Sequence, residues 1–175
     1  MNDCLNIKVE GMHVVDKITY VKTGKVEVID RGHNLVVNKL LPLIMGMLKG
    51  SLSGIQYWAI GSGSSSWDSN PVNPTLSETK LTKEIVRKAV TASEMKYVDP
   101  KTYAESSSPT TCLQISTTYY ENEGNGEWRE FGLFGGNATS AKDSGFMIDK
   151  KHHAILTKTN EMVVERKIFL TISFS

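Results

Sequence analysis

The stretch from Glu127 to Gly136, with the sequence EWREFGLFGG, constrains the fold of this chain more than any other segment. Successive side chains of a strand point to opposite faces. Strict alternation therefore places Trp128, Glu130 and Phe134 on one face and Phe131 on the other. A strand that is apolar on both faces is covered on both sides, so we expect this one in the centre of a sheet.

Several other segments also have β-strand patterns. Ile18–Val21 and Val26–Ile29 flank a short Gly-containing link, which is typical of a hairpin. Thr111–Glu121 is rich in Thr, Tyr and Ile, and we expect it to form an antiparallel hairpin with the Trp128 strand. Met162–Ser175 predicts the last strand. Shorter strands are expected at Leu5–Val9, Ile55–Ile60, Phe146–Asp149 and Ala154–Thr157.

One segment predicts a helix clearly. Lys39–Leu48 carries an apolar stripe, with Asn38 as the expected N-cap and Gly50 as the stop. Thr79–Val90 is ambiguous, and we expect a turn of helix or a loop that leads into a strand. Strands thus dominate, and we expect a single domain over residues 1–175 that is mainly β, a jelly-roll-like β-sandwich with one or two short helices.

Composition excludes some functional classes. The chain has 175 residues, with 20 basic and 19 acidic side chains and a net charge of +1. This balance gives no electrostatic reason to expect nucleic acid as a partner. The first residues lack the apolar core of a signal peptide, and the longest apolar run, Leu40–Leu48, is about half of the ~20 residues that span a bilayer. We expect a protein made in the cytoplasm, with no membrane partner and with Cys4 and Cys112 as reduced thiols.

No motif in the sequence predicts catalysis. Gly61-Ser62-Gly63 resembles the start of a phosphate-binding loop, but no Gly-Lys-Ser/Thr follows it, and no Gly-x-Ser-x-Gly elbow supports a hydrolase. His152 and His153 are adjacent, so in a strand they point to opposite faces and rarely bind one metal; we expect them at an exposed strand end. The sequence therefore predicts neither an enzyme nor a cofactor or metal site.

Two charged residues lie within apolar strand patterns. Arg87 follows Glu84 in the sequence LTKEIVR, and Glu130 lies between Trp128 and Phe131. A charge inside an apolar strand is usually paired. We hypothesise an ion pair between Arg87 and Glu130 at the edge of the core; the alternative is two separately solvated charges.

Three segments together resemble a pattern found in small structural proteins of tailed bacteriophages. The first is Gly32–Asn38, followed by the apolar helix, and the second is Ile60–Gly63, with an irregular loop and then Lys80–Arg87. The third is Trp128–Phe134, which is similar to an Arg-Glu-Ile/Phe-Gly-Leu-Phe element of tail-fibre and baseplate-associated proteins. The Ser64–Thr79 loop, with Trp67 and two prolines, is longer than in that pattern.

The resemblance implies a non-enzymatic virion component of the tail, baseplate or collar. Its partners would be copies of itself and other tail, neck or fibre proteins. We expect contacts at two loops, Ser62–Pro74 and Asp99–Pro109, with Trp67 as an exposed aromatic anchor, since Trp is enriched at interface hot spots. The equal alternative is that Trp67 packs under its own loop. The candidate interface residues are Trp67, Asp68, Asn70 and Tyr103. The alternative function is a carbohydrate-binding β-sandwich that recognises a host-surface glycan, with Trp67, Tyr97 and Tyr103 as aromatics at loop tips.

Overall fold

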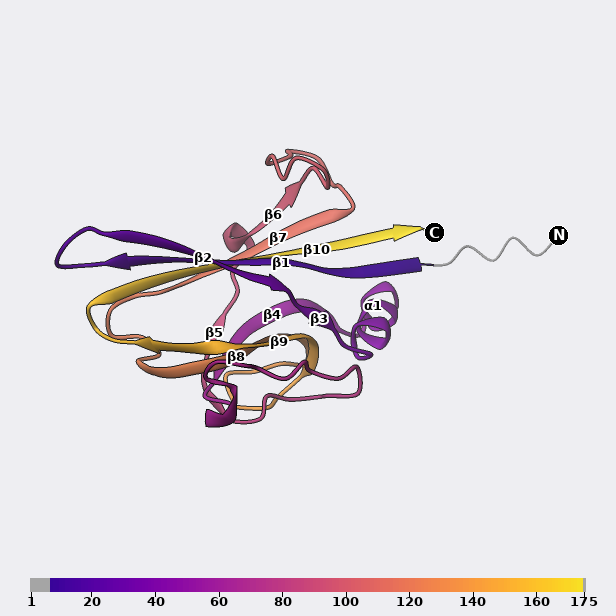
Figure 1. Cartoon of the computed structure of the whole chain (residues 1–175). Coiled ribbons are helices and arrows are strands. Elements are labelled where there is room, and N and C mark those ends of the chain that lie inside the picture. Colours follow the sequence, from indigo (N-terminus) through magenta and orange to yellow (C-terminus); the bar gives the residue numbers. More distant parts are fainter. Residues whose placement is uncertain (1–6, 175) are drawn as a thin grey trace.

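The computed structural model describes residues 7–174, and these form two packed antiparallel sheets with five strands each (Figure 1). The expected mainly β fold and β-sandwich are confirmed. Sheet A has the order β2 (Val26–His33), β1 (Ile7–Tyr20), β10 (Met162–Phe174), β7 (Cys112–Tyr119) and β6 (Met95–Val98). Sheet B has the order β3 (Leu35–Val36), β9 (Phe146–Lys158), β8 (Gly126–Gly136), β4 (Ser53–Gly61) and β5 (Glu84–Ala89).

The chain passes from one sheet to the other after β2, β5, β7 and β9. The expected hairpin between Thr111–Glu121 and the Trp128 strand is therefore wrong, because β7 pairs with β10 and β6, whereas β8 pairs with β4 and β9. The turn between β7 and β8 joins the two layers instead of two neighbouring strands. The hairpin between β1 and β2 is confirmed.

Two of the long strands were expected as separate pieces. β1 is a single strand of 14 residues, and the Leu5 end of the expected first strand lies outside the described residues. β9 is a single strand of 13 residues that joins the two short strands expected on either side of His152 and His153. Polar residues interrupt the apolar pattern of both strands, and some of them, such as Asp16 in β1 and His152 and His153 in β9, are buried.

The helix α1 (Leu40–Leu48) lies at the end of the sandwich where the two sheets diverge (Figure 1). It follows the expected range, although Lys39, not Asn38, occupies the N-cap and no side chain caps the first turn. Gly50 has a φ of +72°, as suits the residue that ends a helix. Two single 3₁₀ turns complete the elements, η1 (Ser65–Trp67) and η2 (Ala92–Glu94). Within residues 7–174, no helix is long and apolar enough to cross a membrane.

Sheet B is buried on both faces. Trp58, Phe131 and Leu133 face the interior between the sheets, while Ala59 and Phe134 belong to a second apolar cluster on the opposite face. Burial of β8 on both faces, between β9 and β4, confirms its expected central position. The outer cluster is covered by the long segment that runs from β4 to β5 and contributes Leu81.

The faces of β8 differ from strict alternation because of a β-bulge. Pairing with β9 shifts between Trp128 and Glu130, where two steps along β8 match four steps along β9, from Leu156 to His152. Trp128 and Phe131 consequently share the inner face, whereas Glu130 and Phe134 lie on the outer side. The expectation that Trp128 shares a face with Glu130 is wrong for this reason.

Substitution of Gly135 tests how closely the backbones of β8 and β4 approach each other. A Cβ atom at Gly135 would lie 2.4 Å from the backbone oxygen of Gly54 and 3.0 Å from Leu43. We expect Gly135→Ala to lower the free energy of unfolding by about 2 kcal/mol, because a backbone atom cannot rotate away from an added methyl group. Urea unfolding measures this change.

Gly54→Ala is the matched control, since its Cβ would meet only the flexible end of Met47, at 3.4 Å. We expect its effect on the free energy of unfolding to stay below about 1 kcal/mol. Equal effects of the two substitutions would contradict the close approach of the strands.

Candidate functional site

The expected contact loop, Ser62–Pro74, lies over the outer face of sheet B. Trp67 is only 8% exposed, and its ring stacks on the ring of His152 with centroids 3.9 Å apart. The expectation of an exposed Trp67 anchor is therefore wrong, and the alternative is confirmed: Trp67 packs under its own loop, against the sheet. His152 and His153 are also buried, at 5% and 3% exposure, so the expectation of an exposed strand end is wrong too.

The other candidate interface residues do not form one surface. Asp68 lies next to Trp67 and accepts a hydrogen bond from Nε of Arg129, while Asn70 is exposed in the same loop. Tyr103 belongs to the loop between β6 and β7 on the other sheet, where its ring packs against Phe169 at 4.6 Å. The loop over sheet B thus brings three of the four candidates together, and Tyr103 lies apart from them.

Glu130 fixes the segment that covers sheet B. Its carboxylate is fully buried and accepts hydrogen bonds from the backbone N–H groups of Thr82 (3.0 Å) and Lys83 (2.8 Å). The ammonium of Lys150 lies 3.2 Å from the same carboxylate and also bonds to Glu78. The charge of Glu130 is therefore used to hold the chain just before β5.

The expected ion pair between Arg87 and Glu130 is wrong, because each has another partner. Arg87 forms a bidentate ion pair with Glu84, with N–O distances of 2.7 and 2.8 Å. Its guanidinium also lies 4.5 Å from the ring centre of Phe134. Residues three apart in a regular strand point to opposite faces. A register shift in the pairing of β5 with β4 near Ile85 places Glu84 and Arg87 on the same side.

A second buried charge cluster lies between the two sheets, and no sequence pattern predicted it. Asp16 on β1 accepts two hydrogen bonds from Arg166 on β10, at 2.6 and 2.7 Å, and a third from Arg31 on β2, at 2.9 Å. Asp16 and Arg166 are fully buried. The guanidinium of Arg166 also lies 4.3 Å from the ring centre of Phe131. This cluster ties the three neighbouring strands of sheet A to the core.

Electrostatics keep Asp16 ionised in the interior. Burial alone would raise the pKa of its carboxyl, but Arg166 and then Arg31 outweigh burial and lower the pKa to about 2. His153 lies at the same cluster, with Nε2 3.4 Å from Arg166 and Nδ1 2.7 Å from the carbonyl of Ala154. Because a carbonyl only accepts, Nδ1 carries the proton and Nε2 faces the guanidinium as an acceptor. Burial, and then the charge of Arg166, lower the pKa of His153 well below its usual value.

The lowered pKa of His153 predicts a loss of stability in mild acid. Below about pH 6.5 the unfolded chain binds a proton at this histidine that the folded chain does not bind, so the folded state loses up to about 1.4 kcal/mol per pH unit. We expect His153→Gln to reduce the pH slope of the unfolding free energy by about 1 kcal/mol per unit between pH 6.5 and 5. Chemical denaturation at several pH values measures the slope.

Two comparisons make this measurement specific. His33→Gln makes the same substitution at an exposed histidine and is the matched control. Asp149 changes the free energy of unfolding in the opposite direction. Burial raises the pKa of its carboxyl well above the usual value, so the folded state loses stability as pH rises above that usual value. The difference between variant and parent cancels this contribution. An unchanged slope in His153→Gln would contradict the assigned protonation state.

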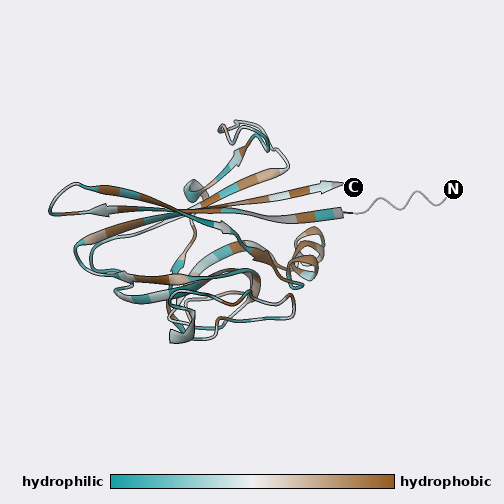
Figure 2. Ribbon diagram, viewed as in Figure 1, coloured by the Kyte–Doolittle hydropathy of each residue, from teal (hydrophilic) through white to brown (hydrophobic). Residues whose placement is uncertain are grey.

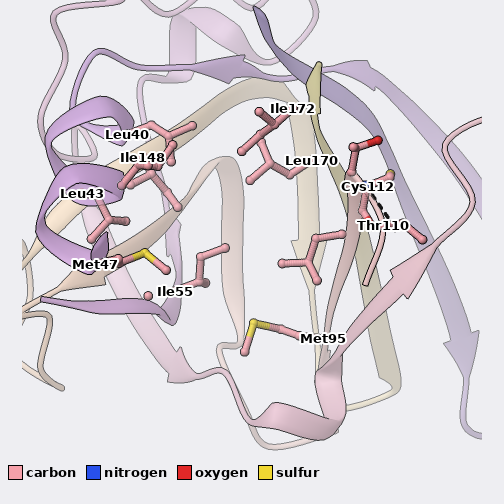
Figure 3. Close-up of a pocket in the computed structure, with 14 residues that line it drawn as sticks. Leu40, Leu43, Met47, Ile55, Met95, Thr110, Cys112, Ile148, Leu170 and Ile172 are labelled. Atoms are coloured by element: carbon pink, nitrogen blue, oxygen red, sulfur yellow. Dashed lines mark hydrogen bonds between the residues drawn. The ribbon is translucent and has the colours of Figure 1, made fainter. Parts of the chain in front are cut away.

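An apolar pocket opens between the sheets beside α1 (Figure 3). It encloses about 610 Å³, and none of its lining residues is charged. Leu40, Leu43 and Met47 project into it from α1, and the opposite wall carries Leu170 and Ile172 from β10. Such a volume lies within the roughly 300–1,000 Å³ of ligand pockets in general.

Few polar groups reach this pocket. The hydroxyl of Thr110 is hydrogen-bonded to the backbone carbonyl of Val98, at 2.7 Å. Cys112 is a buried free thiol in the pocket wall, and Cys4 lies outside the described residues. The pocket is therefore suited to apolar side chains or apolar ligands rather than to charged ones. A strongly apolar helix beside two strands with inward-facing Leu and Ile was the only sequence signal for it.

Within residues 7–174, no group of three or more His, Cys, Asp or Glu side chains has the arrangement of a metal site. The chain matches no protein-family model, and no curated protein sequence is significantly similar to it. The charge clusters and the apolar pocket are therefore the features from which a function has to be argued.

Proposed function

We propose that the protein is a virion structural protein of a tailed bacteriophage, located in the tail, baseplate or collar. In this role it is not an enzyme. It forms a symmetric assembly and attaches neighbouring components such as fibres. It is made in the host cytoplasm and then incorporated into the particle.

One observation carries this proposal: segments that resemble phage structural proteins bind one another in the fold. Glu130, from the Trp128–Phe134 segment, accepts the N–H groups of Thr82 and Lys83 from the Lys80–Arg87 segment. Gly61, from the Ile60–Gly63 segment, lies against Glu130, because a Cβ at Gly61 would be 2.5 Å from its carboxylate oxygen. The three residues Gly61, Thr82 and Glu130 thus belong to one set of contacts. These contacts support the interpretation that the three segments occur together because they form one structural unit.

The same unit makes the sandwich suitable as a rigid building block. The Glu130 contacts and the pair between Glu84 and Arg87 fix the long covering segment to sheet B. A fixed loop loses little conformational entropy when it is buried in a contact. With a net charge of +1, attraction between components would come mainly from buried surface and little from long-range steering.

The alternative, a carbohydrate-binding module, is weaker than the sequence suggested. Its main aromatic candidate was Trp67, which is buried against His152 and cannot stack on a sugar in this conformation. Tyr97 and Tyr103 remain exposed, at 44% and 42%.

The test is the composition of phage particles. Particles of the phage that encodes this chain would be purified through a density gradient and digested for quantitative mass spectrometry. We expect the chain in several copies per particle, and we expect antibody labelling to place it on the tail, baseplate or collar in electron micrographs. A chain that is abundant in infected cells but absent from purified particles would overturn the proposal.

A further inference from the structure

The helix α1 has an exposed apolar face next to the pocket. The side chains of Leu41, Met45, Met47 and Leu48 are 57%, 64%, 47% and 78% exposed. Seven of the nine residues of α1 are Leu, Ile or Met, and most of the helix is coloured as hydrophobic (Figure 2). An exposed apolar patch of this kind on a soluble protein marks an interaction site.

The exposed face and the pocket form one continuous surface. Ile44 lines the pocket, and its helical neighbours at i−3 and i+4 are Leu41 and Leu48, which are exposed. Met47 both lines the pocket and is half exposed, so it lies at the mouth (Figure 3). Leu40 is shared with a smaller hollow of about 210 Å³ that is also lined by Leu41. The exposed apolar side chains of α1 thus lie directly beside the apolar pocket.

We propose that this surface is a contact between two copies of the chain, in which α1 of each copy fills the pocket of the other. A two-fold contact uses the same patch on both subunits, so the patch must carry both a projection and a matching recess. The α1 face and the adjacent pocket meet that requirement. A small apolar ligand would fill the pocket but leave Met45 and Leu48 in water, which is why we assign a second copy.

The size of the surface is compatible with a stable contact. Leu41, Met45, Met47 and Leu48 are about half to three-quarters exposed, so with the pocket walls they offer at most roughly 600 Å² per copy. Complete burial in two copies would reach the lower end of specific interfaces, about 1,200 Å². None of the residues that line the pocket is charged, so no charge would be stranded on association. This inference rests on the proposed function only for the expectation that copies of the chain assemble.

The first test is sedimentation velocity of the purified chain and of Leu48→Glu over a range of concentrations. We expect the parent protein to be a dimer. In the variant, the dissociation constant of the dimer should rise at least about 100-fold, because each dimer would place two carboxylates in apolar surroundings. Val28→Glu is the matched control, since Val28 is 67% exposed on the edge strand β2, and it should dimerise like the parent.

A second variant tests the pocket itself. Ile55→Trp would fill part of the cavity, so we expect a folded chain with an unchanged or higher melting temperature and at least about tenfold weaker dimerisation. A monomeric parent protein would overturn the inference, as would normal dimerisation of Leu48→Glu or Ile55→Trp. Native mass spectrometry that finds a monomer with a bound apolar molecule would favour a ligand site instead.

The particle experiment separates the two proposals. If the chain is found in particles but Leu48→Glu dimerises normally, the virion role stands and the assigned surface is wrong. If dimerisation depends on Leu48 but the chain is absent from particles, the surface stands and the virion role is wrong.

Discussion

Replacement of Asp16 by Asn is expected to lower the free energy of unfolding by about 3–5 kcal/mol. The substitution keeps the shape of the side chain but removes the negative charge that faces Arg166 and Arg31. Arg166 is fully buried, so its charge would remain in the interior without a counterion. Removal of one partner of a buried ion pair is costly for this reason, even where the intact pair contributes little net stability.

Urea unfolding near pH 7 measures the effect, and pH adds a second signature. The pKa of Asp16 is lowered to about 2, so its contribution is complete above the unfolded value of 3.8 and is lost as pH falls toward 2. The difference between parent and Asp16→Asn should shrink over that range. Asp30→Asn, at a side chain that is 61% exposed, is the control and should change stability by less than about 1 kcal/mol.

A double-mutant cycle identifies the cause. In an Arg166→Met background the buried guanidinium is already gone, so Asp16→Asn should cost less than it does in the parent protein. Additive effects of the two substitutions would show that the pair is not the source of the loss.

Glu130→Gln is expected to lower the free energy of unfolding by about 3 kcal/mol and to release the segment over sheet B. An amide group has one acceptor oxygen, so either Thr82 or Lys83 would face an N–H group where it now finds an acceptor. Lys150 would also lose one of its two charged partners.

Hydrogen exchange resolves where this effect appears. We expect faster exchange of the amides in residues 62–83, with little change in sheet A. Glu127→Gln is the matched control on the same strand, because the side chain of Glu127 is 55% exposed and pairs with Arg129 at the surface. Equal exchange in the two variants would contradict the assigned role of Glu130.

Local patterns in the sequence predicted the elements with regular periodicity. The apolar helix at Lys39–Leu48, the central strand at Trp128 and the last strand at Met162 were all expected, because side-chain periodicity depends on local geometry alone. The pairing of β7 with β10 was missed, since the choice between a hairpin and a passage to the other sheet depends on which faces pack together.

The charge clusters were less predictable than the strands. Register shifts at β5 and β8 change which side chains share a face, and a local alternation pattern does not reveal where such shifts occur. Arg87 and Glu130 are both paired, as is usual for charges inside apolar strands, but the expected pair between them was wrong because each binds another partner. Asp16 and Arg166 meet across two strands 150 residues apart in the chain, which no local pattern can reveal.

The pairing of β1 with β10 has a consequence for how the protein is made. Residues 7–20 are hydrogen-bonded to residues 162–174, so the centre of sheet A joins segments that are synthesised first and last among the described strands. Non-local pairing of this kind is slow to form. On the ribosome, β1 must wait for almost all of the described chain to emerge, and sheet A closes only after translation has passed β10. Its edge is meanwhile open to other strands, so chaperones and low temperature during expression should increase the yield of folded protein.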